Sequence, residues 1–206
     1  MAFLDKHGIL HNQTERFPTI VELGCGDRKS IEAAVGIDLI DSSCVDIVGD
    51  AIEVLQSFPP QSLKEIHSYH FIEHLEDVEG LLDSVTRTLE TGGQFVCVAP
   101  HFSNPYFYSD PTHKVFFGLY TFCYWTESNL FKRTTPQYRP IPGLMLTSVD
   151  LIFKDSRPFF VSYFVKRFFG SLINSTRATR EFYERWLTGV FPCYEVLYKV
   201  TKSDRP

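Results

Sequence analysis

The chain of 206 residues is 44% hydrophobic and 22% charged, which predicts one globular domain over residues 1–206 and excludes a disordered or collagen-like chain. Charges and aromatic residues divide unevenly near residue 100. Residues 1–100 carry 6 Lys or Arg, 17 Asp or Glu and 6 aromatic residues. Residues 101–206 carry 14 Lys or Arg, 8 Asp or Glu and 25 aromatic residues. We therefore expect the two parts to have different tasks within one domain.

The sequence indicates neither a membrane-spanning segment nor a secretory signal. It has no run of eighteen apolar residues, and its first residues lack the apolar region of a signal peptide, so a cytoplasmic protein is expected. The five cysteines are scattered and never spaced as C-x-x-C. This favours buried free thiols over disulfides or a thiolate zinc site.

Short apolar runs alternate with helical patterns in the first part of the chain. Strands are expected at residues 19–23, 35–40, 44–48, 64–69 and 93–100, and helices at 30–34, 51–58 and 79–90. The clearest helix is the last, in which the spacing of Leu81, Leu82, Val85 and Leu89 gives one apolar face. Such alternation favours a parallel sheet with helices on both faces.

The pattern changes after Pro100. Residues 101–142 are rich in proline and read as loops, with one helix expected near residues 126–132. Two further strands are expected at 144–154 and 194–201, separated by an aromatic helical insertion at about 158–191.

The first strand ends in a turn suited to ligand binding. In Gly24-Cys25-Gly26, missing Cβ atoms let a ligand approach the backbone amides closely. Asp38 closes the next strand and is suited to bind both hydroxyls of a ribose. The glycine turn together with Asp38 is a more specific signal of ligand binding than the two glycines alone.

Five blocks, in this order, resemble the signature of class I S-adenosylmethionine (SAM)-dependent methyltransferases. They are Val21-Glu22-Leu23-Gly24-Cys25-Gly26, Gly36-Ile37-Asp38, Val48-Gly49-Asp50-Ala51, His70-Phe71-Ile72-Glu73-His74-Leu75 and Leu89-x-x-Gly92-Gly93. The resemblance covers about residues 19–100. It implies an α/β, Rossmann-like class I methyltransferase fold with a seven-stranded, mostly parallel sheet. Residues 19–100 would bind the cofactor and residues 101–206 would form the acceptor site.

The same resemblance implies a role for individual residues. Glu22 would lie below the methionine end of SAM, Asp38 would hold its ribose, and His70 would stand near the methyl donor. The other implied cofactor-binding residues are Gly24, Cys25, Gly26, Leu39, Asp50 and Ala51, with Asp50 and Ala51 meeting the adenine. SAM carries a sulfonium and an ammonium but no phosphate, so acidic residues suit it without a P-loop lysine.

The glycine pattern and the short interval before Asp38 bear on the cofactor and on the first helix. NAD is disfavoured because the third glycine of G-x-G-x-x-G is missing. The short interval between Gly26 and Asp38 leaves little room for a first helix. We therefore expect residues 27–30 to form a loop over the methionine moiety.

Two sets of residues raise the question of a metal. His70-Phe71-Ile72-Glu73-His74 matches H-x-x-E-H, a zinc-ligand spacing of one metallopeptidase class. Because the match lies at a strand-to-helix junction, capping of the following helix by Glu73 and His74 is the preferred interpretation. His101, Asp110 and His113 could hold iron, but their spacing matches no compact facial triad. No metal is therefore expected.

His101, Asp110 and His113 are instead the candidate catalytic residues. They lie just past the strand 93–100, at the edge where open α/β sheets bind ligands. Their segment, with its Asp110-Pro111-Thr112-His113-Lys114 block, resembles one found in a subset of these methyltransferases. A histidine can take the proton of an acceptor hydroxyl. The alternative is structural, with Asp110 and Thr112 ordering a turn and His113 serving as scaffolding.

The expected function is methylation of a hydroxyl on a small molecule or saccharide. If the acceptor atom belongs to a phosphate or carboxylate, no base is needed, and a clamp of cationic side chains is expected. That clamp would consist of Lys114, Lys132, Arg133 and Arg139. A relative that binds the cofactor or a partner without catalysis is the alternative function, and a zinc hydrolase is the less favoured one.

The aromatic residues suggest further contacts. Those of residues 102–125 could build the acceptor pocket, although several are expected to belong to the core. Segment 159–173, with Lys166 and Arg167, would suit an anionic membrane surface, whereas burial as a lid or in a homodimer is the simpler interpretation. Nucleic acid is disfavoured by the overall acidity and the lack of a basic run.

Overall fold

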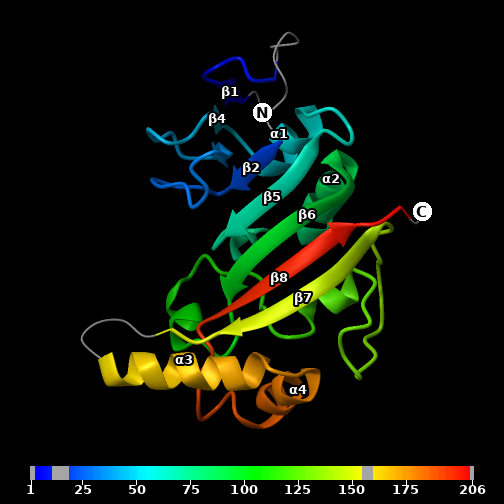
Figure 1. The fold of residues 1–206 in the computed structure, drawn as a ribbon. Coiled ribbons are helices and arrows are strands. Elements are labelled where there is room, and N and C mark those ends of the chain that lie inside the picture. The colour runs from blue at the N-terminus through cyan, green and yellow to red at the C-terminus, as the bar shows by residue number, and fades with distance from the viewer. Residues whose placement is uncertain (1–2, 11–18, 155–159, 205–206) are drawn as a thin grey trace.

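The structure is a computed structural model that describes residues 3–10, 19–154 and 160–204, except for the side chains of 160–163. Its eight strands form one mixed sheet in the order β1-β4-β3-β2-β5-β6-β8-β7 (Figure 1). The strands are β1 Leu4–Asp5, β2 Ile20–Leu23, β3 Val35–Asp38, β4 Ile47–Val48, β5 Leu63–Tyr69, β6 Leu89–Pro100, β7 Leu144–Ile152 and β8 Glu195–Lys202.

The central strands β4, β3, β2, β5 and β6 run parallel to one another. β8 is antiparallel to both β6 and β7, and β1 is antiparallel to β4. The expected seven strands are all present, but the short β1 adds an eighth. A two-residue strand has too little sequence for a period-2 pattern, so the expectation of seven strands was wrong for a physical reason.

Within the described residues, four α-helices accompany the sheet: α1 Ala51–Ser57, α2 Val78–Thr88, α3 Phe160–Asn174 and α4 Arg177–Trp186. The first two begin where aspartates cap them. Asp50 accepts hydrogen bonds from the amides of Ile52 and Glu53, and Asp77 accepts one from Gly80. The preferred interpretation, that Glu73 and His74 cap α2, is therefore wrong.

Helices cover the two faces of the sheet unequally. Figure 1 shows α1 and α2 behind the sheet, whereas α3 and α4 lie beyond the ends of β7 and β8. In the same view no described helix lies in front of β5, β6 and β8. Helices on both faces were expected, but the β2–β3 connection, residues 24–34, forms only turns and bends. The expected helix at 30–34 does not form because so few residues must span the two strand ends.

Three other expected elements differ in the structure. Residues 126–132 form a loop, and a short 3₁₀ helix, Thr121–Tyr124, precedes it. β6 already begins at Leu89, so α2 ends at Thr88 instead of Glu90. The aromatic insertion is two helices, because Thr176 and Thr179 form a capping box that starts α4.

The hydrophobic core lies between the sheet and the helices behind it. Val54 and Leu55 of α1 and Leu81 and Val85 of α2 are fully buried there. In the second part of the chain, the core takes up a share of the aromatic residues, as expected: Phe117, Phe122, Tyr183 and Tyr198 are fully buried. The ring centres of Phe122 and Tyr198 are 4.3 Å apart.

Candidate active site

The implied ligand-binding residues meet at one edge of the sheet. β2, β3, β4 and β5 are parallel, so the segments that follow them lie at the same edge. These segments contain Gly24–Gly26 after β2, Asp38 at the end of β3, Asp50 after β4 and His70 after β5. The structure therefore brings together residues that are spread over nearly fifty positions of sequence.

Both glycines of the turn after β2 have backbone conformations that favour glycine. Gly24 has φ +65°, and a Cβ added to it would lie 2.5 Å from Cδ2 of Phe71. Gly26 has φ +56°, and nothing lies within 4 Å of the position of its Cβ. Gly24 is thus fixed by close packing, whereas Gly26 faces open space in which a ligand can approach the backbone.

Glu22 supports the turns that follow. Its buried carboxylate accepts hydrogen bonds from the amides of Ser30, at 2.8 and 2.9 Å, and Ile31, at 2.8 Å. The expected loop at residues 27–30 is present. Glu22 lies beneath this loop and holds it against the sheet edge.

Asp38 also ties the turn to the sheet. Its carboxylate accepts hydrogen bonds from the amides of Gly26 and Ile40, each at 2.8 Å. Each carboxylate oxygen can accept a second hydrogen bond, so Asp38 can still receive two hydroxyls. The neighbouring side chains of Leu39 and Ile40 are exposed and offer an apolar surface beside it.

Asp50 and Ala51 are placed where the next helix begins. Asp50 uses Oδ1 to cap α1, at 2.9 Å from the amide of Ile52 and 3.1 Å from that of Glu53. Its Oδ2 makes no contact in that cap. Ala51 is buried as the first residue of α1.

Cys25 is buried in the same turn. Burial, together with the negative charges of its neighbours, raises the pKa of the Cys25 thiol to about 12. All five cysteines are free thiols and four of them are buried, as expected from their spacing.

His70 links this edge to the last strand. Its Nε2 lies 2.9 Å from Oε1 of Glu195, and its Nδ1 lies 3.4 Å from Oε1 of Glu73. The hydrogen bond with Glu195 and then the proximity of Glu73 raise the pKa of His70 to about 9. Lys154, at 2.5 Å from Oε2, is the second cation beside Glu195.

A cavity of about 580 Å³ lies next to this group. Glu195, the partner of His70, is part of its wall, and Lys154, Lys166, Tyr106 and Tyr194 also line it. Sequence patterns did not single out Lys154 or Glu195, because their position depends on strand pairing. The cavity combines aromatic walls with two cationic side chains at the edge that carries the other site residues.

The catalytic candidates do not form one group. The side chain of His101 is fully buried, its Nε2 lies 3.0 Å from Glu184, and its Nδ1 lies 2.8 Å from the Ser103 hydroxyl. The Ser103 amide also donates to Nδ1, at 3.1 Å. Both ring nitrogens are therefore engaged inside the protein, which is the arrangement of a structural histidine.

Asp110 and His113 instead lie beside His74. Nε2 of His113 is 3.7 Å from Oδ2 of Asp110, and the rings of His74 and His113 are 4.9 Å apart. Thr112 donates its hydroxyl to Asp110 at 2.5 Å, which holds the pKa of Asp110 below its ordinary value. Asp110 and Thr112 thus order the turn, as the structural alternative states.

The H-x-x-E-H residues do not have the geometry of a metallopeptidase site. His70 has a left-handed backbone, with φ +52°, and only Ile72–His74 form a 3₁₀ turn. His70 points to Glu195, whereas His74 contacts Thr112. The two histidines therefore do not lie on one face of a helix.

The proposed cationic clamp is also divided. Lys114 pairs with Glu76, and Arg139 pairs with Glu79 and Asp83. Lys132 and Arg133 line a separate cavity of about 810 Å³ beside α4. The structure does not bring the four side chains together.

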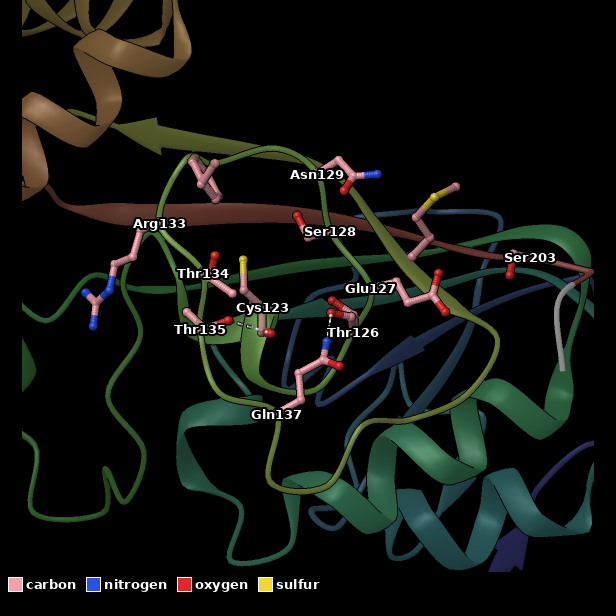
Figure 2. A pocket seen from close by; sticks show the side chains of 12 residues that line it. Cys123, Thr126, Glu127, Ser128, Asn129, Arg133, Thr134, Thr135, Gln137 and Ser203 are labelled. Carbon is pink, nitrogen blue, oxygen red and sulfur yellow. Dashed lines mark hydrogen bonds between the residues drawn. The ribbon is translucent and has the colours of Figure 1, made fainter.

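Another cavity, of about 750 Å³, lies away from the site. Figure 2 shows its largely polar lining on the loop from Cys123 to Gln137, with Ser203 beside the end of β8. Ser203 lies at the opposite end of β8 from Glu195. This cavity therefore lies away from the sheet edge that carries His70, whereas the cavity of about 580 Å³ lies beside that edge.

Segment 159–173 presents apolar side chains to solvent. Residue 159 lies outside the described residues, and Phe164, Val165, Phe168 and Leu172 of α3 are exposed. These four side chains do not form a buried lid in the structure. Among the described residues, no helix is both long and apolar enough to cross a bilayer.

No family model and no curated protein matches the chain. Among solved structures, it is similar to a SAM-dependent methyltransferase from Archaeoglobus fulgidus, at 20% identity over 89% of this chain and 85% of that chain, with a TM-score of 0.53. It is also similar to a chain in the complex of the Haloferax volcanii Trm112 methyltransferase activator with a candidate methyltransferase. That match has 19% identity over 96% of this chain and 88% of the other, with a TM-score of 0.51. The likeness shows that this chain has the Rossmann-like fold of these methyltransferases.

Proposed function

We propose that this chain is a SAM-dependent class I methyltransferase that methylates an oxygen atom of a small-molecule or saccharide acceptor. The observation that carries the proposal is the convergence of the Gly24–Gly26 turn, Asp38 and Asp50 at one sheet edge. The fold shared with known methyltransferases supports it.

The residues present fit this cofactor. Oxygens of Asp38 have lone pairs left for the ribose hydroxyls, and the exposed Leu39 offers an apolar surface to the adenine. Asp50 Oδ2 can accept from the adenine amino group. Gly26 leaves room beside the backbone for the methionine part. When bound, SAM supplies an electrophilic methyl group on a sulfonium.

The acceptor cavity indicates which acceptors fit. Lys154 and Lys166 line it together with Tyr106 and Tyr194, so it suits a flat or ring-shaped acceptor that also bears negative charge. The chain's own contribution is to hold the acceptor oxygen in line with the methyl group and to exclude water. An anionic acceptor oxygen, such as that of a carboxylate, has no proton to lose, whereas a hydroxyl must pass its proton to a base as the new C–O bond forms.

Isothermal titration calorimetry with SAM and with S-adenosylhomocysteine tests the proposal. Wild type should bind both, and Asp38→Ala should weaken binding by roughly 10- to 100-fold, because charged hydrogen bonds are lost. Asp41→Ala is the matched control, since Asp41 lies three residues away and pairs with Lys6 at the surface. If wild type binds neither ligand, the proposal is wrong.

A further inference from the structure

A cluster of metal-ligating groups lies beside the acceptor edge, and it is not the pair that the H-x-x-E-H spacing suggests. One ligand atom from each of Glu73, His74 and His113 lies within 4.8 Å of the others. We propose that these three side chains bind a divalent transition-metal ion. Glu73 and His74 come from the segment after β5, and His113 comes from the loop after β6.

The hydrogen bonds of His74 and His113 leave Nε2 of each ring available to bind a metal ion. Nδ1 of His113 lies 2.8 Å from the carbonyl oxygen of Phe107, which can only accept, so Nδ1 carries the proton. The Thr112 hydroxyl donates to Asp110, so it accepts from Nδ1 of His74, at 2.9 Å. In the neutral ring, each Nε2 then keeps its lone pair. Such outer hydrogen bonds are typical of metal-bound histidines.

Glu73 provides a second and independent observation. Its side chain is only 1% exposed, and neither carboxylate oxygen has a hydrogen-bond partner. Nδ1 of His70 forms an ion pair with Oε1 at 3.4 Å, while Nε2 of the same ring is hydrogen-bonded to Glu195. A buried carboxylate without hydrogen bonds is costly and rare, and a metal ion would satisfy it.

The donor set indicates the class of ion and its task. Two imidazoles and one carboxylate suit Zn²⁺, Mn²⁺, Fe²⁺ or Co²⁺ and leave coordination positions open. This task rests on the proposed function: the ion would hold the acceptor oxygen at an open coordination position. His113 is then a ligand and not a general base.

Titration of the untagged protein with Co²⁺, followed by visible absorption and competition with Zn²⁺, tests the site without SAM. We expect one equivalent to bind, and His74→Ala and His113→Ala each to weaken binding at least roughly tenfold. Thr112→Val keeps all three ligands but should still weaken binding, by roughly tenfold, because it frees the His74 ring. Glu73→Gln keeps the side-chain volume and should also weaken it.

His7→Ala is the matched control, because it removes an exposed imidazole near Asp46 and should leave binding unchanged. Thermal unfolding of every variant shows whether it is folded. The proposal is overturned if wild type binds no Co²⁺, or if folded His74→Ala and His113→Ala bind it like wild type. Neither result bears on whether SAM binds.

A different observation supports an interaction surface on α3. Phe164, Phe168 and Leu172, at 67%, 75% and 54% exposure, follow one another every four residues and form a stripe on one side of the helix. The other side is packed inward, where Phe169 contacts Phe153 and Phe191. Each of these three side chains is more than half exposed to solvent.

The charges near the stripe favour an anionic partner. Arg167 of α3 is exposed, and the helix contains no acidic residue. The two acids of α4 turn inward: Glu181 accepts from the amide of Lys132, and Glu184 accepts from that of Leu119. Exposed apolar and basic side chains together are typical of helices at a lipid surface, so we infer that α3 docks on a membrane of anionic lipids.

Sedimentation with vesicles tests this inference. The wild type should bind vesicles of equal parts phosphatidylserine and phosphatidylcholine but not pure phosphatidylcholine, and Phe168→Glu should abolish binding. Tyr138→Ser, at a highly exposed ring elsewhere, should bind like wild type. The inference is overturned if neither vesicle is bound, or if the protein forms a dimer that Phe168→Glu dissociates while vesicles stay unbound.

Discussion

Nε2 of His70 lies 2.9 Å from Oε1 of Glu195, although the two residues are 125 positions apart in sequence. This contact joins the parallel part of the sheet to the start of the antiparallel strand β8. It thereby places the edge that carries Gly24–Gly26 and Asp38 beside the cavity lined by Lys154 and Tyr194. The proposed cofactor and acceptor sites meet at this pair.

Removal of the Glu195 carboxylate should loosen that junction. Burial raises its pKa, but hydrogen bonds from His70 and Lys154 outweigh this and hold the pKa below its ordinary value. We expect Glu195→Ala to lower the free energy of unfolding by about 1–2 kcal/mol, because two charged contacts are lost while both cations can be resolvated. Urea denaturation measures the change.

Glu76→Ala is the control for this experiment. Glu76 also pairs with a lysine, Lys114, but both side chains are exposed. Its removal should cost no more than about 0.5 kcal/mol. Equal losses of unfolding free energy in the two variants would show that the buried position of Glu195 adds nothing to the stability of the protein.

The two glycines of the turn should respond differently to alanine. Gly24→Ala combines a left-handed backbone with a clash against Phe71, so we expect a loss of about 3 kcal/mol or more. Gly26→Ala meets open space and should cost about 1 kcal/mol, which is the backbone strain alone. Urea denaturation compares the two variants, and a similar loss for both would contradict the packing described around Gly24.

Asp50 has a structural role that can be separated from its proposed binding role. Asp50→Ala removes the cap of α1 and should destabilise the protein by about 1 kcal/mol. Asp50→Ser should keep most of the stability, because serine is also a good N-cap, but should weaken SAM binding. Thermal unfolding and calorimetry measure the two effects, and unchanged SAM affinity in Asp50→Ser would remove Asp50 from the cofactor site.

Much of the first part of the fold could be predicted from sequence because its signals are local. The apolar run of β2, the turn at Gly24–Gly26 and the cap of α1 each occupy a few consecutive residues. Parallel pairing then places their ends at one edge without any further information. This is why the expected cofactor residues lie together in the structure.

The acceptor side could not be predicted in the same way. Glu195 reaches His70, and Thr112 reaches His74, only because distant segments pack together. The burial of Glu73 likewise depends on the loop after β6, whose Lys114 amide donates to the Glu73 carbonyl at 2.8 Å. One error was avoidable, since Thr176 and Thr179 have the spacing of a helix cap and indicate that the insertion divides there.

The reactivity of Cys25 gives a prediction that depends on pH. A thiol reacts as its thiolate, and with a pKa of about 12 roughly one Cys25 in ten thousand is ionised at pH 8, against about one in ten at the ordinary value of 9.0. Cys44 is partly exposed and donates only a weak hydrogen bond to the Gly26 carbonyl, at 3.1 Å. We therefore expect iodoacetamide at pH 8 to label Cys44 well before Cys25 in the folded protein, as followed by peptide mass spectrometry. In urea both should react at similar rates, because unfolding removes the burial that raises the Cys25 pKa. Rapid labelling of Cys25 in the folded protein would contradict its burial beneath the turn.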